Sequence, residues 1–188
     1  MVERRNRDLA GAMVQPVSEL ITWLDGDEGK SRPYRARRLA RLLEVVTIPS
    51  NGIMFWGGSN SAQCFTELRL AFIHGLYLAT VLLALAFIEQ EIAGLLHAAG
   101  WDGAQSSPLE KLLRKARQQS VITEGEYKSF ERLRVVRNAY AHFRHFNHPT
   151  AWHNRALSAE TDLDGILEAD VDGAIQALGT FITRQSGS

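Results

Sequence analysis

The sequence predicts an all-α protein, a helical bundle preceded by an N-terminal helical extension. Its 188 residues contain no stretch with convincing period-2 alternation, whereas helix start and stop signals are frequent. One run, Ala71–Ile88, is apolar on every face, as expected of a helix surrounded by others. The composition, 45% hydrophobic and 22% charged, is that of a soluble globular protein large enough to bury a core.

The N-terminal extension and its loop, residues 1–60, should contain two helices. The first spans Met13–Trp23 and ends at the turn DGDEGK. The second spans Tyr34–Val46 and follows Pro33, because proline suits the first turn of a helix. A loop rich in Gly, Ser and Asn then leads to the main body. Three roles stay open for this extension: binding RNA, covering the bundle or engaging a partner.

The main body, residues 61–188, begins with the longest expected helix. It runs from Ser61 to about Ala98, with Gly75 and Gly94 as the points where it would bend. The apolar run inside it, Ala71–Ile88, has 18 residues and so reaches the lower limit for a membrane span. We favour a buried bundle helix over a span, because the run contains a histidine and two glutamates follow it closely.

Two further helices should follow the loop AGWDGAQSSP. Ser107 is expected to cap the first, which spans Leu109 to about Gln119. Thr123 is expected to cap the second, because a glutamate three residues later has the spacing of a capping box. This second helix should reach about Phe146, since Pro149 cannot continue it.

Charges are segregated along the chain although the formal net charge is zero, with 21 basic and 21 acidic residues. Ser31–Arg41 holds five arginines and no acid, and Glu110–Arg144 holds nine basic and four acidic residues. Acids gather instead in the first turns of a last helix, expected from Leu163 or Asp170 to Arg184, where the helix dipole favours them. Such segregation allows local phosphate binding by a neutral protein.

Two observations predict a cytoplasmic location. Cys64 is the only cysteine, which excludes a disulfide within the chain and a cysteine-based zinc site. The basic N-terminal segment is not followed by the apolar core of a signal peptide.

The segment VRNAYAH, Val136–His142, carries the candidate chemistry. On a helix Asn138 and His142 are four residues apart and share a face, which Arg134 extends. Arg137 points about 140° away from His142, and its long side chain would reach round the helix or serve a site shared with a second copy. Arginine binds phosphate oxygens and histidine transfers protons near neutrality, so the set suits RNA cleavage without a metal.

The motif and its setting resemble the HEPN family (higher eukaryotes and prokaryotes nucleotide-binding). VRNAYAH has the form R-N-x-x-x-H, and the long apolar helix before it, with Glu89 near its end, is similar to that of family members. The resemblance covers roughly residues 61–147. It implies an up-and-down bundle of four to five core helices, which dimerises so that the motif helices of two copies face each other.

The resemblance also implies a function. It implies a metal-independent endoribonuclease, a toxin or phage-defence effector, that leaves 2′,3′-cyclic phosphate ends at a composite dimer site. By motif match, Arg137 and His142 would be catalytic and Asn138 supporting, with no metal or cofactor. The expected partners are RNA, a second copy, and an antitoxin or other partner protein. RNA contacts are expected from four further residues: Arg134, Tyr140, Arg144 and His145.

Two alternatives stay open. The first is a HEPN-like bundle that binds nucleotide, RNA or a protein partner without cleaving, which the unmatched extension and the balanced charge favour. The second is a metal site, because His142, His145 and His148 recur every three residues. No carboxylate between Glu131 and Glu160 completes such a ligand set, so no metal is expected. No membrane association is expected either, because we interpret the apolar run as a buried helix of the bundle.

Overall fold

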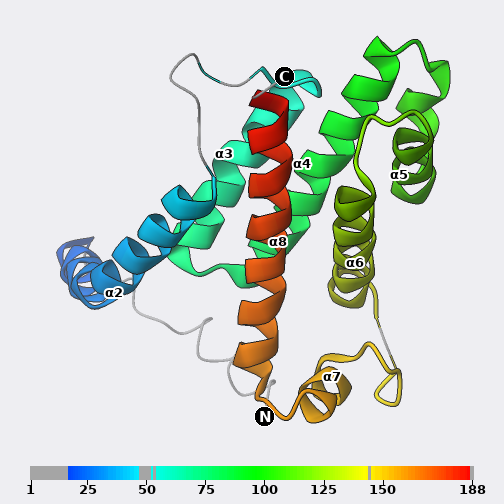
Figure 1. The fold of residues 1–188 in the computed structure, drawn as a ribbon. Coiled ribbons are helices and arrows are strands. Elements are labelled where there is room, and N and C mark those ends of the chain that lie inside the picture. The colour runs from blue at the N-terminus through cyan, green and yellow to red at the C-terminus, as the bar shows by residue number, and fades with distance from the viewer. Residues whose placement is uncertain (1–16, 47–51, 53, 144, 187–188) are drawn as a thin grey trace. The chain divides into compact units, whose positions relative to one another are not determined.

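In a computed structural model the protein is an all-α helical bundle, as predicted (Figure 1). No strand occurs in the part of the chain that the structure describes. The described residues are 17–46, 52, 54–143 and 145–186. By its contacts the chain divides into two compact units, residues 1–37 and residues 38–188.

Helix α2 runs without interruption from Val17 to Val45, so the prediction of two helices separated by a turn is wrong. Pro33 lies inside this helix, and so do the glycines of the DGDEGK segment. Glycine and proline disfavour a helix interior by about 1 and 3 kcal/mol, which weakens a helix without forbidding it. An ion pair between Glu28 and Arg35, with 2.6 Å between Oε1 and Nη2, spans the segment and favours its helical form.

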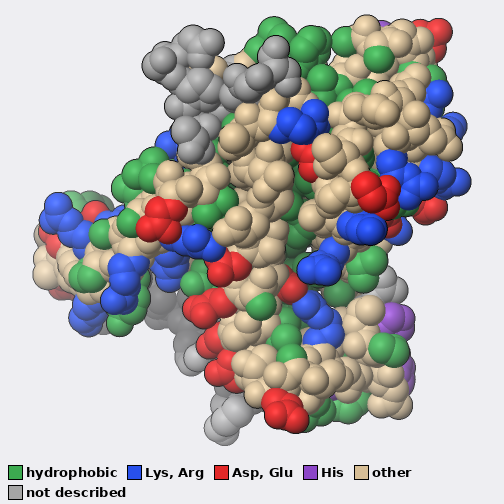
Figure 2. All heavy atoms as spheres, viewed as in Figure 1, with side chains coloured by type: hydrophobic (Ala, Val, Ile, Leu, Met, Phe, Trp, Pro, Cys, Tyr) green, Lys and Arg blue, Asp and Glu red, His purple; other side chains and the backbone are tan. Residues whose placement is uncertain are grey.

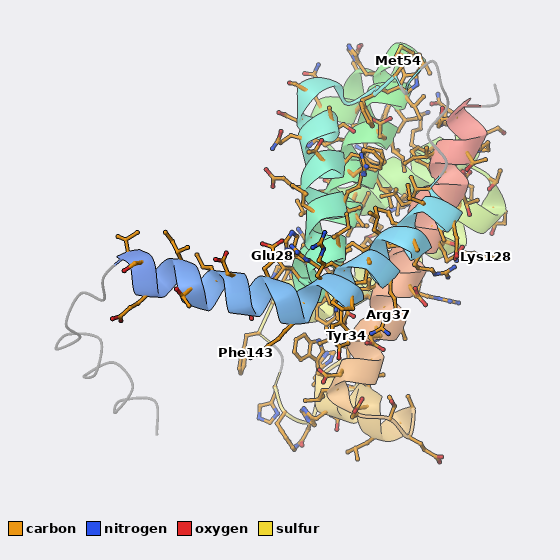
Figure 3. All side chains as sticks on the ribbon, turned by 90° about the vertical axis from the view of Figure 1, so that its left-hand side faces the viewer. Glu28, Tyr34, Arg37, Met54, Lys128 and Phe143 are labelled. Carbon is orange, nitrogen blue, oxygen red and sulfur yellow. The ribbon has the colours of Figure 1, made fainter. Side chains whose placement is uncertain are left out.

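Two arginines of the first unit are held by contacts within their own helix. Arg35 pairs with Glu28, and the Arg37 guanidinium lies 4.8 Å from the centre of the Tyr34 ring (Figure 3). The arginine-rich segment is therefore partly compensated locally, which reduces the charge it offers to a partner.

The second unit is built around helix α4, Tyr77–Ala98, and Val81, Ile88 and Ile92 in this helix are fully buried. The helices that pack against it are α3 (Gly58–His74), α5 (Leu109–Gln118), α6 (Glu124–Ala141) and α8 (Leu163–Ser186). The end of α2 also joins this core, through Leu42 and Val46. By its contacts the part of α2 from Arg38 onward belongs to the second unit.

Gly75 separates α3 from α4, so the expected single helix over residues 61–98 is two helices. Its φ of 74° is left-handed, and its N–H and that of Leu76 bond to the carbonyls of Phe72 and Ala71. The Arg38 guanidinium donates to the Ile73 carbonyl over 3.2 Å and would lie 2.8 Å from any Cβ on Gly75. Only glycine allows both the left-handed backbone and the close approach of the guanidinium. The helix therefore ends at this position and does not bend through it.

The carboxylate of Glu91, 2% exposed, fastens the start of α3 to α4. It accepts hydrogen bonds from the backbone of Trp56 and Gly57 at 3.3 and 3.0 Å, and from the Ser61 hydroxyl at 2.5 Å. Gly94 lies beside this contact, and a Cβ there would be 2.2 Å from the Trp56 carbonyl oxygen. Gly94 therefore serves close packing and does not bend the helix.

The predicted start of α6 is confirmed, and that of α5 differs in detail. Thr123 and Glu126 form the expected capping box, with 2.7 Å from Thr123 N to Glu126 Oε2. Arg184 of α8 also donates to Glu126, over 2.8 Å. Ser107 does not cap α5, because its hydroxyl donates to the carbonyl of Gly103 in the short 3₁₀ helix η1, Asp102–Ser106.

Helix α6 ends at Ala141, five residues earlier than predicted. Val136 is the last buried residue of the helix and Tyr140 still packs against the core, whereas Phe143, just after the helix, is 93% exposed and gains nothing from a continued helix (Figure 3). The following loop instead packs on α7, Trp152–Ser158, an element that the sequence did not reveal. The predicted last helix is confirmed as α8, from Leu163.

Among the described residues, α4 is the one helix long and apolar enough to cross a membrane, judged by length and composition alone. The core helix of a soluble bundle has the same properties, and 44% of its most apolar 18-residue window is buried. The run considered as a span, Ala71–Ile88, is interrupted at Gly75 and so is not one helix.

Candidate functional site

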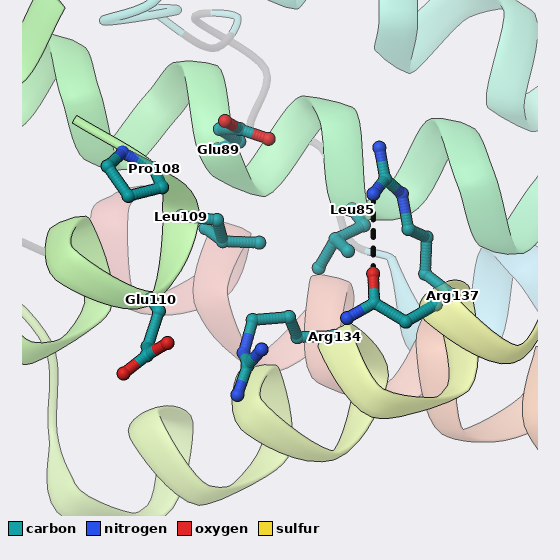
Figure 4. Close-up of a pocket in the computed structure, with 8 residues that line it drawn as sticks. Leu85, Glu89, Pro108, Leu109, Glu110, Arg134 and Arg137 are labelled. Atoms are coloured by element: carbon teal, nitrogen blue, oxygen red, sulfur yellow. Dashed lines mark hydrogen bonds between the residues drawn. The ribbon is translucent and has the colours of Figure 1, made fainter. Parts of the chain in front are cut away.

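The candidate residues of α6 border an open cavity of about 300 Å³ between α4, α5 and α6 (Figure 4). Arg134, Arg137 and Asn138 line it from α6, with Leu85 and Glu89 facing them from α4. The start of α5 completes the wall, with Pro108, Leu109 and Glu110. The structure thus brings together two of the three predicted catalytic residues and one predicted RNA contact.

Arg137 carries a charge that no neighbouring acid neutralises. In the described part of the chain no carboxylate lies within ion-pair distance of its guanidinium. Its hydrogen bond to Asn138 Oδ1 is long, 3.4 Å from Nη1 (Figure 4). The cation is half-buried at the cavity wall, so an anionic ligand would meet it in a partly desolvated site.

Arg134 is engaged by a neighbour on its own helix. Its Nη2 and Nε donate to Glu131 Oε2 at 2.8 and 3.1 Å. This hydrogen bond is the main reason why the pKa of Arg134 is raised, so the side chain stays protonated. The acid offsets part of its positive charge, which leaves Arg137 as the stronger candidate for binding a phosphate.

His142 follows α6 directly and does not line the cavity. Its backbone is extended, with φ −125° and ψ 142°, because the helix ends one residue earlier. It therefore does not share a helical face with Asn138, which corrects the geometry expected from an uninterrupted helix. Its side chain is exposed and accessible to a ligand or to a second copy of the chain.

The segment after His142 forms a loop held by its own polar contacts. His145 is exposed, and its Nδ1 accepts from Asn147 N at 3.3 Å. Arg144, a predicted RNA contact, lies outside the described residues. The ring of His153 stacks on Phe146 at 3.8 Å between centres, which holds this loop against α7.

Tyr140 points away from the cavity, toward α7 and α8. Its hydroxyl donates to Asp170, which also accepts two hydrogen bonds from Arg155 at 2.6 and 2.8 Å. Its ring packs edge-on against Trp152, with 5.1 Å between centres. Burial, followed by the bond to Asp170, raises the pKa of Tyr140. Tyr140, which was predicted to contact RNA, therefore lies apart from Arg137 and the cavity.

No group of three or more His, Cys, Asp or Glu side chains within the described ranges has the arrangement of a metal site. The described histidines of this region, His142, His145, His148 and His153, lie on a loop and on α7. His148 Nδ1 is 2.8 Å from the Thr150 hydroxyl, a contact that stabilises the turn there.

Glu89 is the site residue that spacing alone could not identify. It borders both this cavity and a second one of about 370 Å³, which Gln90, His97 and Gln105 also line. In the sequence it is marked as the acid near the end of the long apolar helix, with another acid two residues further on. Packing decides whether Glu89 or Glu91 points into the core, and the residue that does so is Glu91.

Comparison with protein-family models, with characterised proteins and with solved structures finds no match to this chain. The candidate site is therefore defined by its own residues and geometry.

Proposed function

We propose that this protein is a metal-independent endoribonuclease of HEPN type that acts as a homodimer, with a role as a toxin or defence effector. The observation that carries the proposal is the cation of Arg137, which borders an open cavity and makes no ion pair with a carboxylate among the described residues. An exposed histidine, His142, follows on the same segment. A cation suited to binding phosphate and an imidazole able to transfer a proton, both carried by one segment, support cleavage of a phosphodiester.

The proposed reaction is a transesterification within RNA. A base removes the proton of a ribose 2′-hydroxyl, and this oxygen attacks the adjacent phosphorus. The bond from phosphorus to the 5′-oxygen breaks, leaving a 2′,3′-cyclic phosphate and a 5′-hydroxyl. Arg137 stabilises the charge that develops on the phosphate, and Asn138 steadies its guanidinium through their hydrogen bond. His142 makes one of the two proton transfers, either from the attacking 2′-oxygen or to the leaving 5′-oxygen, and a water molecule makes the other.

A second copy is part of the proposal because none of the described residues that line the cavity of one copy is a histidine. His142 is exposed beyond the helix end, where it is accessible to the partner's cavity. Two copies with facing α6 helices would place Arg137 of one and His142 of the other at one phosphate.

The test is cleavage of single-stranded RNA by the purified protein in EDTA. Arg137→Ala should slow cleavage about 10²–10³-fold, the usual effect of removing a group that stabilises developing charge. His142→Ala should slow it about 10²–10⁴-fold. Arg132→Ala is the matched control, because Arg132 is an exposed arginine of α6 that lines a different cavity. Folded variants that cleave as fast as the parent would refute the proposal, and so would products with 5′-phosphates.

A non-catalytic binding module is the second candidate. It is favoured by the absence of His142 from the wall of the cavity, which leaves one copy with binding groups but no proton donor there. It predicts that RNA, a nucleotide or a partner protein binds without turnover, and that Arg137→Ala weakens binding. Catalytic degradation of RNA by the isolated protein would argue decisively against it.

A further inference from the structure

The carboxylate of Glu89 has no role in the fold that its contacts explain. It is half-buried, yet within the described residues it makes no hydrogen bond or ion pair. Its neighbour in the cavity, Glu110, pairs with Arg114 at 3.0 Å, and Glu91 is fully bonded in the core. A carboxylate that faces an open cavity and is not used by the fold is available to bind a ligand.

The surroundings of Glu89 have the properties of a slot for a flat ring. Apolar side chains of Leu85, Pro108 and Leu109 line the same cavity. In Figure 4 Leu109 lies between Glu89 and Arg134, and Leu85 lies beside the guanidinium of Arg137. The cavity volume of about 300 Å³ is at the lower end of sites for small molecules, and suits one nucleobase with its sugar and phosphate at the open side.

Hydrogen-bond chemistry selects one base for this carboxylate. A carboxylate only accepts hydrogen bonds, so it favours a base that presents donors side by side. Guanine presents N1–H and an N2 amino group as neighbours. Adenine and cytosine each place a ring acceptor beside their amino group, and uracil places a carbonyl on each side of its single N–H. None of these three presents two donor groups side by side to the carboxylate.

We propose that the cavity between α4, α5 and α6 binds a guanine base, with Glu89 accepting hydrogen bonds from N1–H and the N2 amino group. Arg137 at the same cavity wall then binds the phosphate of that nucleotide. The inference rests on the proposed function, because it makes the protein an endoribonuclease that selects guanosine at the cleaved position.

The experiment is a calorimetric titration of the full-length protein in EDTA with GMP, IMP and AMP. IMP differs from GMP only by the missing N2 amino group, so this comparison tests one hydrogen bond without any protein variant. GMP should bind about 10-fold more tightly than IMP or AMP, as expected for a specific pair of hydrogen bonds to a base edge. Equal affinities for GMP and IMP, or no binding of either, would overturn the base site.

Two variants assign the preference to its residue. Glu89→Gln keeps the size of the side chain but turns one acceptor into a donor, and should reduce the affinity for GMP to that for IMP. Glu67→Gln, at an exposed position of α3, should leave the GMP preference unchanged. A Glu89→Gln protein that still prefers GMP would overturn the assignment.

Cleavage measured beside binding separates this inference from the proposed function. Selective binding of GMP by a protein that does not cleave RNA would support the base site and refute the ribonuclease. Cleavage without any preference for guanosine, together with equal binding of GMP and IMP, would support the ribonuclease and refute the base site. His142→Ala should abolish cleavage and leave GMP binding intact, because His142 does not line the cavity.

Discussion

Three acids on neighbouring elements show how burial and partners decide what a residue does. Glu91 is buried and bonded to two backbone N–H groups and a hydroxyl, and Asp170 is buried and bonded to Tyr140 and Arg155. Glu89 is half-buried and faces an open cavity. The first two hold the fold, whereas the third is available to a ligand.

Replacing Glu91 should therefore destabilise the protein. Glu91→Gln turns one acceptor toward donors that have no other partner, at a cost of about 1–3 kcal/mol in the free energy of unfolding. Urea unfolding followed by circular dichroism measures it. Glu89→Gln is the control and should stay within about 0.5 kcal/mol of the parent. Equal losses for the two variants would contradict the distinct roles assigned here.

Tyr140 should make the fold sensitive to high pH. Burial and the bond to Asp170 raise the pKa of Tyr140 above its usual value of 10.0 in the folded state only. Below pH 10 both states are neutral at this residue and its contribution is fully present. Above that pH the unfolded chain loses the proton first, so stability falls as pH rises toward the folded-state pKa. Melting temperatures at pH 9 to 11 should fall less steeply for Tyr140→Phe than for the parent.

Two helices in this protein end where a further turn would gain no favourable contact with the core. α6 stops at Ala141, and beyond it Phe143 and Phe146 are exposed and would gain nothing from a continued helix. α3 stops at Gly75, where a left-handed residue and the Arg38 guanidinium close the helix end. The early end of α6 matters for function, since it gives His142 an extended backbone and an exposed side chain.

Glycines at two positions should respond to alanine in opposite directions. Gly75→Ala would impose a left-handed conformation on alanine and crowd Arg38, with an expected loss of about 1–3 kcal/mol. Gly173→Ala, in the interior of α8 with no atom within 4 Å, should raise stability by about 0.5–1 kcal/mol. Thermal unfolding compares the two. A Gly75→Ala protein as stable as the parent would contradict the account of this helix end.

At the scale of the whole molecule, the neutral net charge conceals two different surfaces. Figure 2 shows basic side chains gathered over α5 and α6, with acids among them, and acidic side chains along the first half of α8. The basic region suits a polyanion. The acidic region suits a different partner, or the basic region of another molecule.

A dimer with composite sites predicts that two inactive variants regain activity together, which is not possible if each site lies within one copy. Arg137→Ala and His142→Ala proteins, each inactive alone, should regain activity when co-expressed, because a mixed dimer contains one site with both groups intact. With random pairing the recovered activity should be about a quarter of the parent's. RNA cleavage by the co-purified mixture measures it. Activity no higher than that of the single variants would argue for sites within one copy.

The sequence by itself determined the fold class, the capping box that begins α6, the last helix and the motif residues at the end of α6. These follow from local rules: the scarcity of alternating patterns, cap chemistry at Thr123, and the pairing of residue types near Arg137. Local rules failed at the DGDEGK segment, where weak helix formers do not break α2.

Only the tertiary structure decided which acid of α4 is buried, where α6 ends, and which motif side chains meet. Glu89 and Glu91 look alike in the sequence, and packing against the start of α3 selects Glu91 for the core. Tyr140 lies within the motif, yet its ring packs between α7 and α8 while Arg137 and Asn138 border the cavity. The physical reason is that burial depends on residues distant in sequence, whereas helix and cap signals act within a few residues.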